Sequence, residues 1–150
     1  MLVVSACLAG IPCRYDGAAR PDQEIVELVR TGRAVPVCAE VLGGLPTPRP
    51  PAEIVGGDGA DVRDGRAKVV TADGLDVTEA FLRGARAAAD VAIGAGARRA
   101  ILHARSPSCG CGTIYDGTFT GTPRMGDGVA AAEFRQRGIH VEERRGSRPS

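Results

Sequence analysis

The sequence lacks tryptophan, and aromatic residues make up only 3% of its 150 residues. It also lacks an excess of charge, because the formal net charge is +1 and like charges form no long run. Such a chain has no extended basic field to hold a nucleic-acid backbone, so we expect no nucleic acid polymer as a partner. No stretch reaches the roughly 18 apolar residues of a membrane span, which predicts a cytoplasmic protein with no membrane partner.

Glycine and proline are abundant instead, with 21 and 10 residues. Much of the chain must therefore form shaped loops, which usually carry function on a small scaffold. The length is typical of one domain and is sufficient for a core without disulfide bonds. We expect a single domain over residues 1–143 and a disordered tail over residues 144–150.

Short apolar runs alternate with helical patterns along the chain. The runs predict strands at residues 2–6, 34–37, 100–103 and 139–141. Helices are predicted after Asp22, from Val77 onward and over residues 128–136. Strands separated by helices favour a parallel sheet with right-handed crossovers. The predicted fold class is α/β: a single-domain Rossmann-like sheet, mostly parallel, with helices on its faces and long cysteine-bearing loops at the C-terminal ends of the strands.

Several finer predictions concern the loops and helix ends. Proline density over residues 43–65 predicts no regular element there, and residues 67–71 predict a short strand or an edge hairpin. Asp76 and Glu79 have the spacing of a capping box, which predicts a helix start. Asp127 is expected to cap the last helix.

Five cysteines lie in three separate loops, each at or just beyond a predicted strand. They are Cys7 and Cys13, then Cys38, then Cys109 and Cys111. Open α/β sheets bind ligands at the carboxyl ends of their strands, so thiols delivered there could converge on one metal centre. In a reducing compartment, clustered cysteines indicate metal or redox chemistry more often than disulfides.

The cysteine spacing favours iron over zinc. Structural zinc sites usually show Cys-x-x-Cys or Cys/His pairs, but Cys7 and Cys13 are too far apart and Cys109 and Cys111 too close. Thiolates from separate loops hold iron–sulfur clusters without a fixed local spacing.

Position in the loops then selects the ligands. Cys7 and Cys38 directly follow strands, and Cys109 is held between a proline and a glycine, so we expect these three to bind the metal. Three protein ligands leave one metal position open, as in catalytic zinc sites. Cys13 and Cys111 lie further out on their loops and are either spare thiols near the site or a fourth ligand.

Several linked motifs follow one another along nearly the whole chain. They are Ser5-Ala6-Cys7-Leu8-x-Gly10, Arg14-Tyr15-Asp16-Gly17, Cys38-x-Glu40, Gly43-Gly44-Leu45-x-x-Pro48-Arg49-x-Pro51-x-Glu53-Ile54, Asp76-Val77-Thr78, Ser106-Pro107-Ser108-Cys109-Gly110 and Ile114-Tyr115-Asp116-Gly117-Thr118-Phe119-x-Gly121. In this order they resemble the thiouracil desulfidase family of TudS-like proteins, formerly a domain of unknown function.

The resemblance implies a 4Fe-4S enzyme that removes sulfur from a thiolated pyrimidine such as 2-thiouracil, giving uracil and sulfide without net redox change. It implies that Cys7, Cys38 and Cys109 hold the cluster. It also implies an acidic residue and a serine beside the cluster, which correspond to Glu40 and Ser108, with Ser106 as the second serine.

The same chemistry follows from the donors. A thiocarbonyl sulfur is soft, so an open iron suits it, and coordination makes the adjacent carbon open to attack by water. The sulfur would then be captured by that iron. Glu40 would deprotonate the water or protonate the ring nitrogen, which is worth about 10²–10⁴ in rate. Ser108 would hydrogen-bond the substrate or the departing sulfur.

Four loop residues are candidates for holding a flat, polar base. Arg14 and Arg49 could orient its carbonyl group, and Tyr15 and Tyr115 could stack on its ring. Each has an alternative role, because surface arginines are usually solvated or paired and tyrosines often plug a core. The expected partner is a small thiolated nucleobase or nucleoside. No feature of the sequence selects an oligomeric state.

Two other kinds of protein share these features. One is a noncatalytic zinc or iron–sulfur binding module, in which the third loop simply closes the coordination shell. The other is a thiol redox protein or sulfur carrier that uses Cys7 with Cys13, or Cys109 with Cys111, as a reactive pair.

Overall fold

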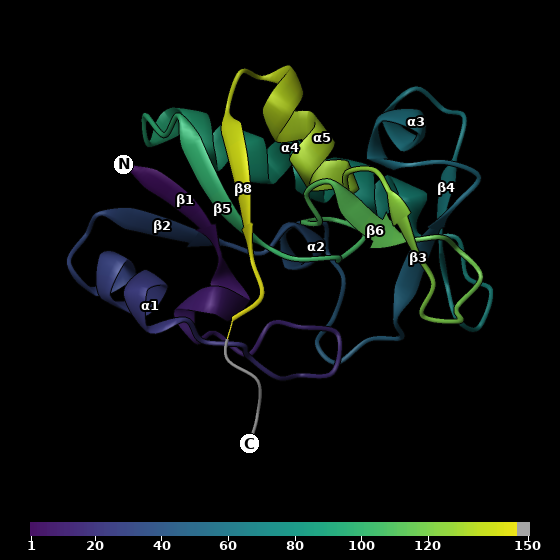
Figure 1. Cartoon of the computed structure of the whole chain (residues 1–150), viewed down its shortest axis with the longest axis horizontal. Helices are drawn as coiled ribbons and strands as arrows, with labels where there is room; N and C mark the ends of the chain where they lie inside the picture. The colour runs from purple at the N-terminus through teal and green to yellow at the C-terminus, as the bar shows by residue number, and fades with distance from the viewer. Residues whose placement is uncertain (147–150) are drawn as a thin grey trace.

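A four-stranded parallel sheet forms the centre of the computed structural model, which describes residues 1–146 (Figure 1). Its strands lie in the order β2-β1-β5-β8. They are β1 (Leu2–Ser5), β2 (Ala34–Val37), β5 (Arg99–His103) and β8 (His140–Arg144). All three pairings are parallel, which confirms the predicted α/β class with a mostly parallel sheet.

Alternate residues of the two central strands, β1 and β5, face two different cores. Val3 of β1 packs in the larger core, whereas its neighbour Val4 packs in the smaller one. Leu102 and Ile101 of β5 divide in the same way. Because a strand is buried on both faces, it is apolar along its length rather than alternating, which explains why these runs are recognisable in the sequence.

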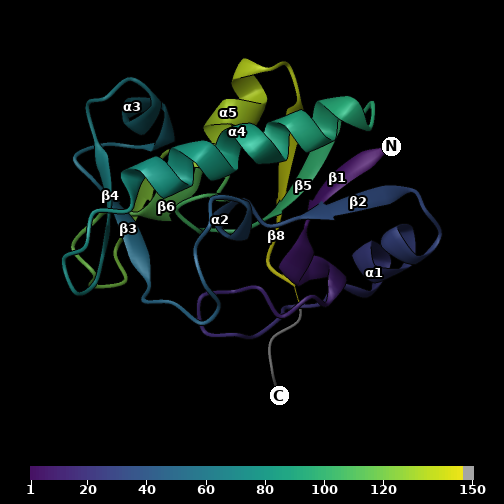
Figure 2. The ribbon, with the colours of Figure 1, turned by 180° about the vertical axis from the view of Figure 1, so that it is seen from behind.

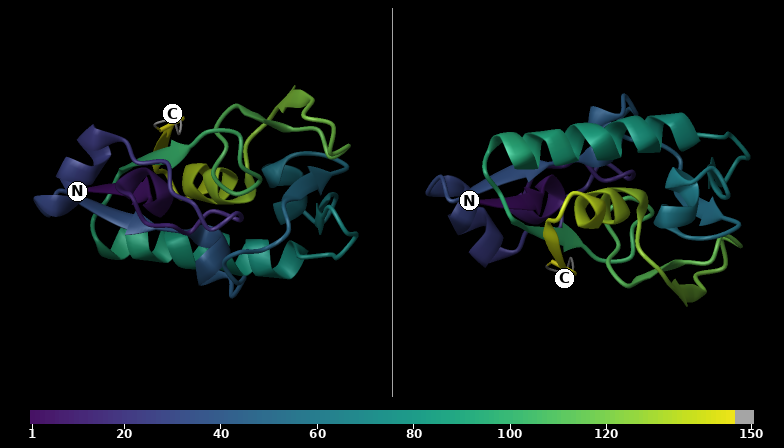
Figure 3. Two further views of the ribbon diagram at one scale, coloured as in Figure 1. Left: turned by 90° about the horizontal axis from the view of Figure 1, so that it is seen from below. Right: turned by 90° about the horizontal axis from the view of Figure 1, so that it is seen from above.

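Helices cover both faces of the sheet. The larger core contains residues of α4 (Thr78–Gly94) and α5 (Val129–Gln136), and the smaller one contains residues of α1 (Gln23–Arg30) and the 3-10 helix η1 (Ala6–Ala9). Seen from behind, α4 crosses in front of the strands (Figure 2). The views from below and above show α1 and α4 on opposite sides of the sheet (Figure 3).

The prediction that residues 43–65 contain no regular element is wrong. This stretch contains β3 (Ala52–Val55) and α3 (Gly59–Arg63). β3 forms an antiparallel pair with β4 (Lys68–Thr71), which confirms the strand expected near residues 67–71. The proline-rich part ends at Pro51, so the strand that follows it can form its ladder.

The sequence pattern also does not predict a second pair of antiparallel strands. This pair consists of β6 (Thr113–Tyr115) and β7 (Pro123–Met125), which pair in antiparallel fashion. Each has only three residues, too few for an alternating pattern.

The helix caps agree with the sequence in one of three cases. Asp22 caps α1, since its side chain accepts hydrogen bonds from Glu24 N and Ile25 N. The N-cap of α4 is Val77 rather than Asp76, and no side chain forms a capping hydrogen bond at this helix end. The Asp76 carboxylate accepts a hydrogen bond from Thr78 N instead. The expected capping box is therefore absent. Asp127 does not cap α5 either.

The one-turn helix α2 (Ala39–Leu42) is held against α4 by two glycines. A Cβ atom on Gly84 would lie 1.8 Å from the carbonyl oxygen of Ala39, and one on Gly43 would lie 2.0 Å from that of Ala80. Only glycine permits this backbone contact. It fixes the position of α2, which begins directly after Cys38 and carries Glu40.

The last strand, β8, includes Arg144, which was expected in the tail. The Arg144 guanidinium forms ion pairs with Asp22 and Glu24 at the start of α1. These ion pairs connect the C-terminal end of β8 to α1. Residues 147–150 of the expected tail lie outside the described residues. No helix among residues 1–146 is both long and apolar enough to cross a membrane.

Candidate metal and substrate site

A cavity of about 680 Å³ lies at the carboxyl ends of the parallel strands. Cys7 follows β1, Cys38 follows β2 and Cys109 lies in the loop after β5, and all three line the cavity. Arg145, directly after β8, lines it as well. The ligand crevice is therefore where a parallel α/β sheet predicts it.

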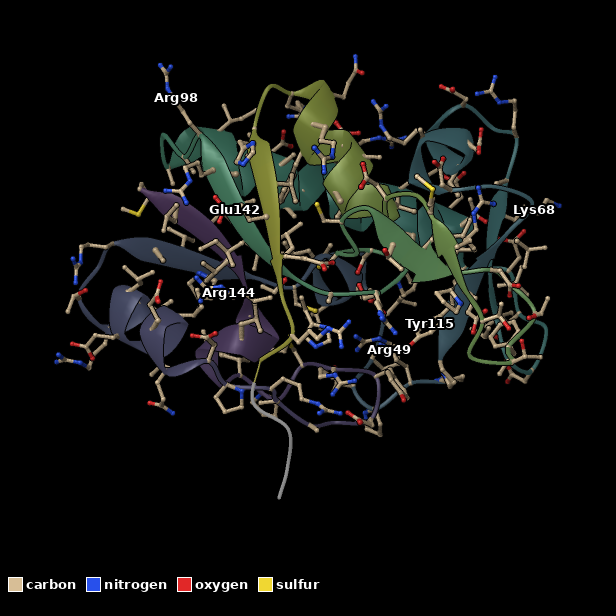
Figure 4. All side chains as sticks on the ribbon, in the orientation of Figure 1. Arg49, Lys68, Arg98, Tyr115, Glu142 and Arg144 are labelled. Carbon is tan, nitrogen blue, oxygen red and sulfur yellow. The ribbon has the colours of Figure 1, made fainter. Side chains whose placement is uncertain are left out.

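The cavity lining includes every site residue predicted from the sequence. Besides the three cysteines, it contains Arg14, Tyr15, Glu40, Arg49, Ser106, Ser108 and Tyr115. Figure 4 labels Arg49 and Tyr115, which come from different segments of the chain and line the same cavity. The fold thus brings these residues to one place, and their individual roles stay predictions.

Two hydrogen bonds hold the Glu40 carboxylate. Arg49 Nε donates to Oε1 at 3.0 Å, and the Ser108 hydroxyl donates to Oε2 at 2.8 Å. Ser108 is buried, and its hydroxyl lies 3.2 Å from that of Ser106. The acid and both serines therefore form one connected chain, with the carboxylate fixed at both oxygens.

Arg49 connects three loops of the cavity wall. Beyond Glu40, its guanidinium donates to the carbonyl oxygens of Pro46 and Cys13 and to the Thr47 hydroxyl. Its side chain is only 5% exposed. Because protein groups occupy most of its donors, the geometry favours a supporting role over direct contact with a ligand.

The loop that carries Cys109 is built around Ser106. The Ser106 hydroxyl oxygen accepts from Cys109 N at 2.6 Å and from Ser108 N at 3.2 Å. The first turn of α5 also binds this loop, since Ala130 N donates to the Ser108 carbonyl. The Cys109 thiol is thereby placed by a local turn and by a helix end together.

Three of the cavity thiols, those of Cys13, Cys38 and Cys109, have a raised pKa and hold their protons tightly. Burial raises the pKa of Cys109 to about 11. A hydrogen bond from Cys38 lowers the pKa of Cys13, but the Cys7 thiol and burial outweigh it and raise the value to about 11. The Cys13 thiol, then burial, raises the pKa of Cys38. A metal would have to displace these protons.

The donor set fits an iron–sulfur cluster. Among residues 1–146, no group of three or more His, Cys, Asp or Glu side chains could hold a metal ion as they stand. A polynuclear centre takes thiols spaced around a volume rather than gathered at one point, and the cavity wall supplies Cys7, Cys13, Cys38 and Cys109. Soft thiolates of this kind select iron–sulfur clusters or zinc over hard cations.

Other cavity residues escaped the sequence argument. His103, at the end of β5, lines the cavity. Burial, then the charges of Arg14 and Arg20, lowers its pKa to about 4. Arg105 lines the same wall with a φ of 66°, a left-handed backbone that is unusual outside glycine. Both residues could have been identified from the sequence, because they lie at or just after the C-terminal end of a predicted central strand.

The fold and the cavity together define a class: an α/β protein whose parallel strands deliver thiols and a fixed carboxylate to one crevice. Residues 2–145 match the model of the 2-thiouracil desulfurase family. The chain belongs to this family, which confirms the resemblance seen in the motifs and the class of enzyme it implied.

Two similar proteins support the assignment. The chain is 50% identical over 141 residues to the uncharacterized protein YbbK of Bacillus subtilis (strain 168), covering 94% of this chain and 93% of YbbK. It is also similar to the structure of the 4Fe-4S-dependent thiouracil desulfidase TudS, with a TM-score of 0.82 and 45% identity. That match covers 95% of this chain and 89% of TudS.

Proposed function

We propose that this protein is a cytoplasmic enzyme that removes sulfur from a thiolated pyrimidine, 2-thiouracil or a similar base or nucleoside. The products are the oxo base and sulfide, so no net oxidation or reduction takes place. The observation that carries the proposal is one cavity that combines thiols from three strand ends with a carboxylate fixed by Ser108 and Arg49. The name of TudS, the similar solved structure, supports the same cofactor and substrate class.

Cys7, Cys38 and Cys109 would hold a 4Fe-4S cluster at the cavity wall. When bound, the cluster would supply a soft Lewis acid that a thiocarbonyl sulfur prefers and that makes the adjacent carbon electrophilic. The rest of the reaction depends on side chains that bind the base and move protons.

Glu40 would act as the general base toward the attacking water and then return a proton to the ring nitrogen. Its two oxygens already accept from Arg49 and Ser108, so the carboxylate need not reorient when substrate binds. We infer that Arg49 positions Glu40 and that Ser108, with Ser106 behind it, hydrogen-bonds the substrate or the departing sulfur. A positioned acid–base group of this kind is worth about 10²–10⁴ in rate.

Arg14 would recognise an oxo group of the base. Its Nη1 atom is buried and has no hydrogen-bond partner among residues 1–146, although Arg14 lines the cavity. A buried donor without a partner is costly, so a ligand carbonyl would satisfy it. Its guanidinium also lies 5.8 Å from the centre of the Tyr15 ring. Tyr15 and Tyr115 are the aromatic residues of the wall that could stack on a flat base.

Sulfide release tests the activity and the role of Glu40. Protein loaded with its cluster without oxygen should release sulfide from 2-thiouracil and form uracil. Glu40→Gln should keep the cluster and lower turnover by about 10²–10⁴-fold. The matched control is Glu79→Gln, a change at an exposed residue of α4, which should keep the parental rate. A Glu40→Gln variant that turns over at the parental rate would show that Glu40 is not the acid–base group of the reaction.

Metal analysis separates the enzyme from a zinc-binding module. Iron and acid-labile sulfide should be present in equal amounts, and the anaerobic protein should be brown. Cys38→Ser should lose the colour and the activity together. A colourless protein that holds one zinc ion and releases no sulfide would leave the desulfidase proposal without support.

A further inference from the structure

Four of the five cysteines line the cavity, one more than the three proposed cluster ligands. The fourth is Cys13. The fifth, Cys111, is occupied elsewhere: Arg135 Nη2 donates to its sulfur at 2.9 Å, and its thiol lies 3.6 Å from the Val141 carbonyl oxygen. The structure therefore separates two thiols that the sequence left equivalent.

The Cys13 thiol lies among the proposed ligands rather than at the rim. It packs in one cluster with Cys7 and Cys38 and lines the same cavity as Cys109. The residue is buried, with 8% of its surface exposed. A thiol in this position faces the same space as the other three.

Hydrogen bonds hold the backbone of Cys13 against the part of the cavity wall that contains Arg49 and Cys38. The Cys13 carbonyl oxygen accepts from Arg49 Nη2 at 2.9 Å and from the Cys38 thiol at 3.8 Å, and the Cys13 N–H donates to the Ile11 carbonyl at 2.8 Å. Since Arg49 also binds Glu40, the fourth thiol and the proposed base are held by the same guanidinium.

We propose that Cys13 is a fourth, exchangeable ligand of the cluster, which closes the substrate position until a thiocarbonyl sulfur takes its place. The inference rests on the proposed function. On exchange, the Cys13 sulfur leaves with the electron pair of its bond and takes a proton from water, so no electron is transferred. It gives up that proton when it returns after sulfide and the oxo base have left. In the absence of substrate, Cys13 thereby keeps water and oxygen from the open position.

Controlled oxidation of the loaded protein tests this ligand. An iron atom without a protein thiolate is the one lost on mild oxidation, which leaves a 3Fe-4S cluster with a distinct electron paramagnetic resonance signal. Parent, Cys13→Ala and the control Cys111→Ala are loaded without oxygen and treated with one equivalent of ferricyanide. We expect at least a fivefold larger 3Fe-4S signal from Cys13→Ala, with parent and Cys111→Ala alike. An equal signal from parent and Cys13→Ala overturns the assignment.

Mössbauer spectroscopy of the parent protein gives a second measurement that does not depend on a variant. With ⁵⁷Fe in the cluster, the resting parent should show no iron site that stands apart, and 2-thiouracil should create one. A distinct iron site in the resting parent overturns the assignment while leaving the desulfidase proposal intact. A parent that takes up no iron overturns both.

Discussion

At the scale of single residues, the site depends on side chains whose orientation is set by neighbours from other segments of the chain. Glu40 is held by Ser108, 68 residues along the chain, and by Arg49. Removing a buried partner such as Arg49 would leave a carboxylate without compensation, which is more costly than losing an exposed pair. Arg49 is therefore expected to matter for the shape of the site even without touching substrate.

His103 gives a pH-dependent prediction at the same scale. Burial, followed by the charges of Arg14 and Arg20, lowers its pKa to about 4, below the usual 6.5 of the unfolded chain. The neutral imidazole therefore contributes stability above pH 6.5, and this contribution is lost as the pH falls toward 4. Between pH 7 and pH 5, the metal-free parent should lose about 2 kcal/mol more unfolding free energy than His103→Gln.

Urea unfolding at the two pH values measures this difference. Because both proteins share all other titrating groups, subtracting their losses isolates the histidine. Equal losses in the parent and in His103→Gln would show that the imidazole is not buried in its neutral form.

At the scale of elements, the contact between α2 and α4 decides where Cys38 and Glu40 stand. A Cβ atom on Gly84 would lie 1.8 Å from the Ala39 carbonyl oxygen, which is backbone and cannot rotate away. Gly84→Ala should therefore push α2 off α4, at a cost of about 1–3 kcal/mol. The same displacement should lower the iron content of the loaded protein, because Cys38 directly precedes α2.

The same helix offers a matched control. Gly94 ends α4, and a Cβ atom there would meet nothing within 4 Å. Gly94→Ala should leave the protein as stable as the parent or slightly more stable, since alanine favours helix by about 0.5–1 kcal/mol. If both variants keep parental stability and iron content, the close contact of the two elements does not position the site.

At the scale of the whole molecule, every strand of the parallel sheet ends at the cavity, and a cluster held by Cys7, Cys38 and Cys109 would join β1, β2 and β5. A ligand that binds only the folded state stabilises it by about 2.7 kcal/mol at a hundredfold excess over Kd. For a domain of this size, this corresponds to a rise in Tm of about 5–10 °C. Anaerobic calorimetry of the protein before and after cluster removal measures it.

Cys38→Ser serves as the control for that measurement. Its Tm should not respond to iron and sulfide, because one of the three strand-end thiols is missing. A parent whose Tm is the same with and without its cluster would mean that the thiols of the separate strands do not share one centre.

Local patterns explain the parts of the fold that the sequence predicts well. The apolar runs of β1, β2 and β5 and the Asp22 cap of α1 depend on neighbouring residues, whose spacing is visible in one dimension. The predictions failed where pairing between distant segments overrides local preference. β3 forms directly after the proline-rich stretch because β4 supplies its ladder, and short β6 exists only through β7.

The sequence by itself determined which strands are followed by a cysteine or a cysteine-bearing loop, and hence that at least three thiols gather at one edge of the sheet. Only the tertiary structure decided that Cys13 faces that cavity while Cys111 contacts Arg135, and that Arg49 binds Glu40. The physical reason is that strand and helix periods are local, whereas the direction of a loop side chain depends on partners that folding alone brings within hydrogen-bonding distance.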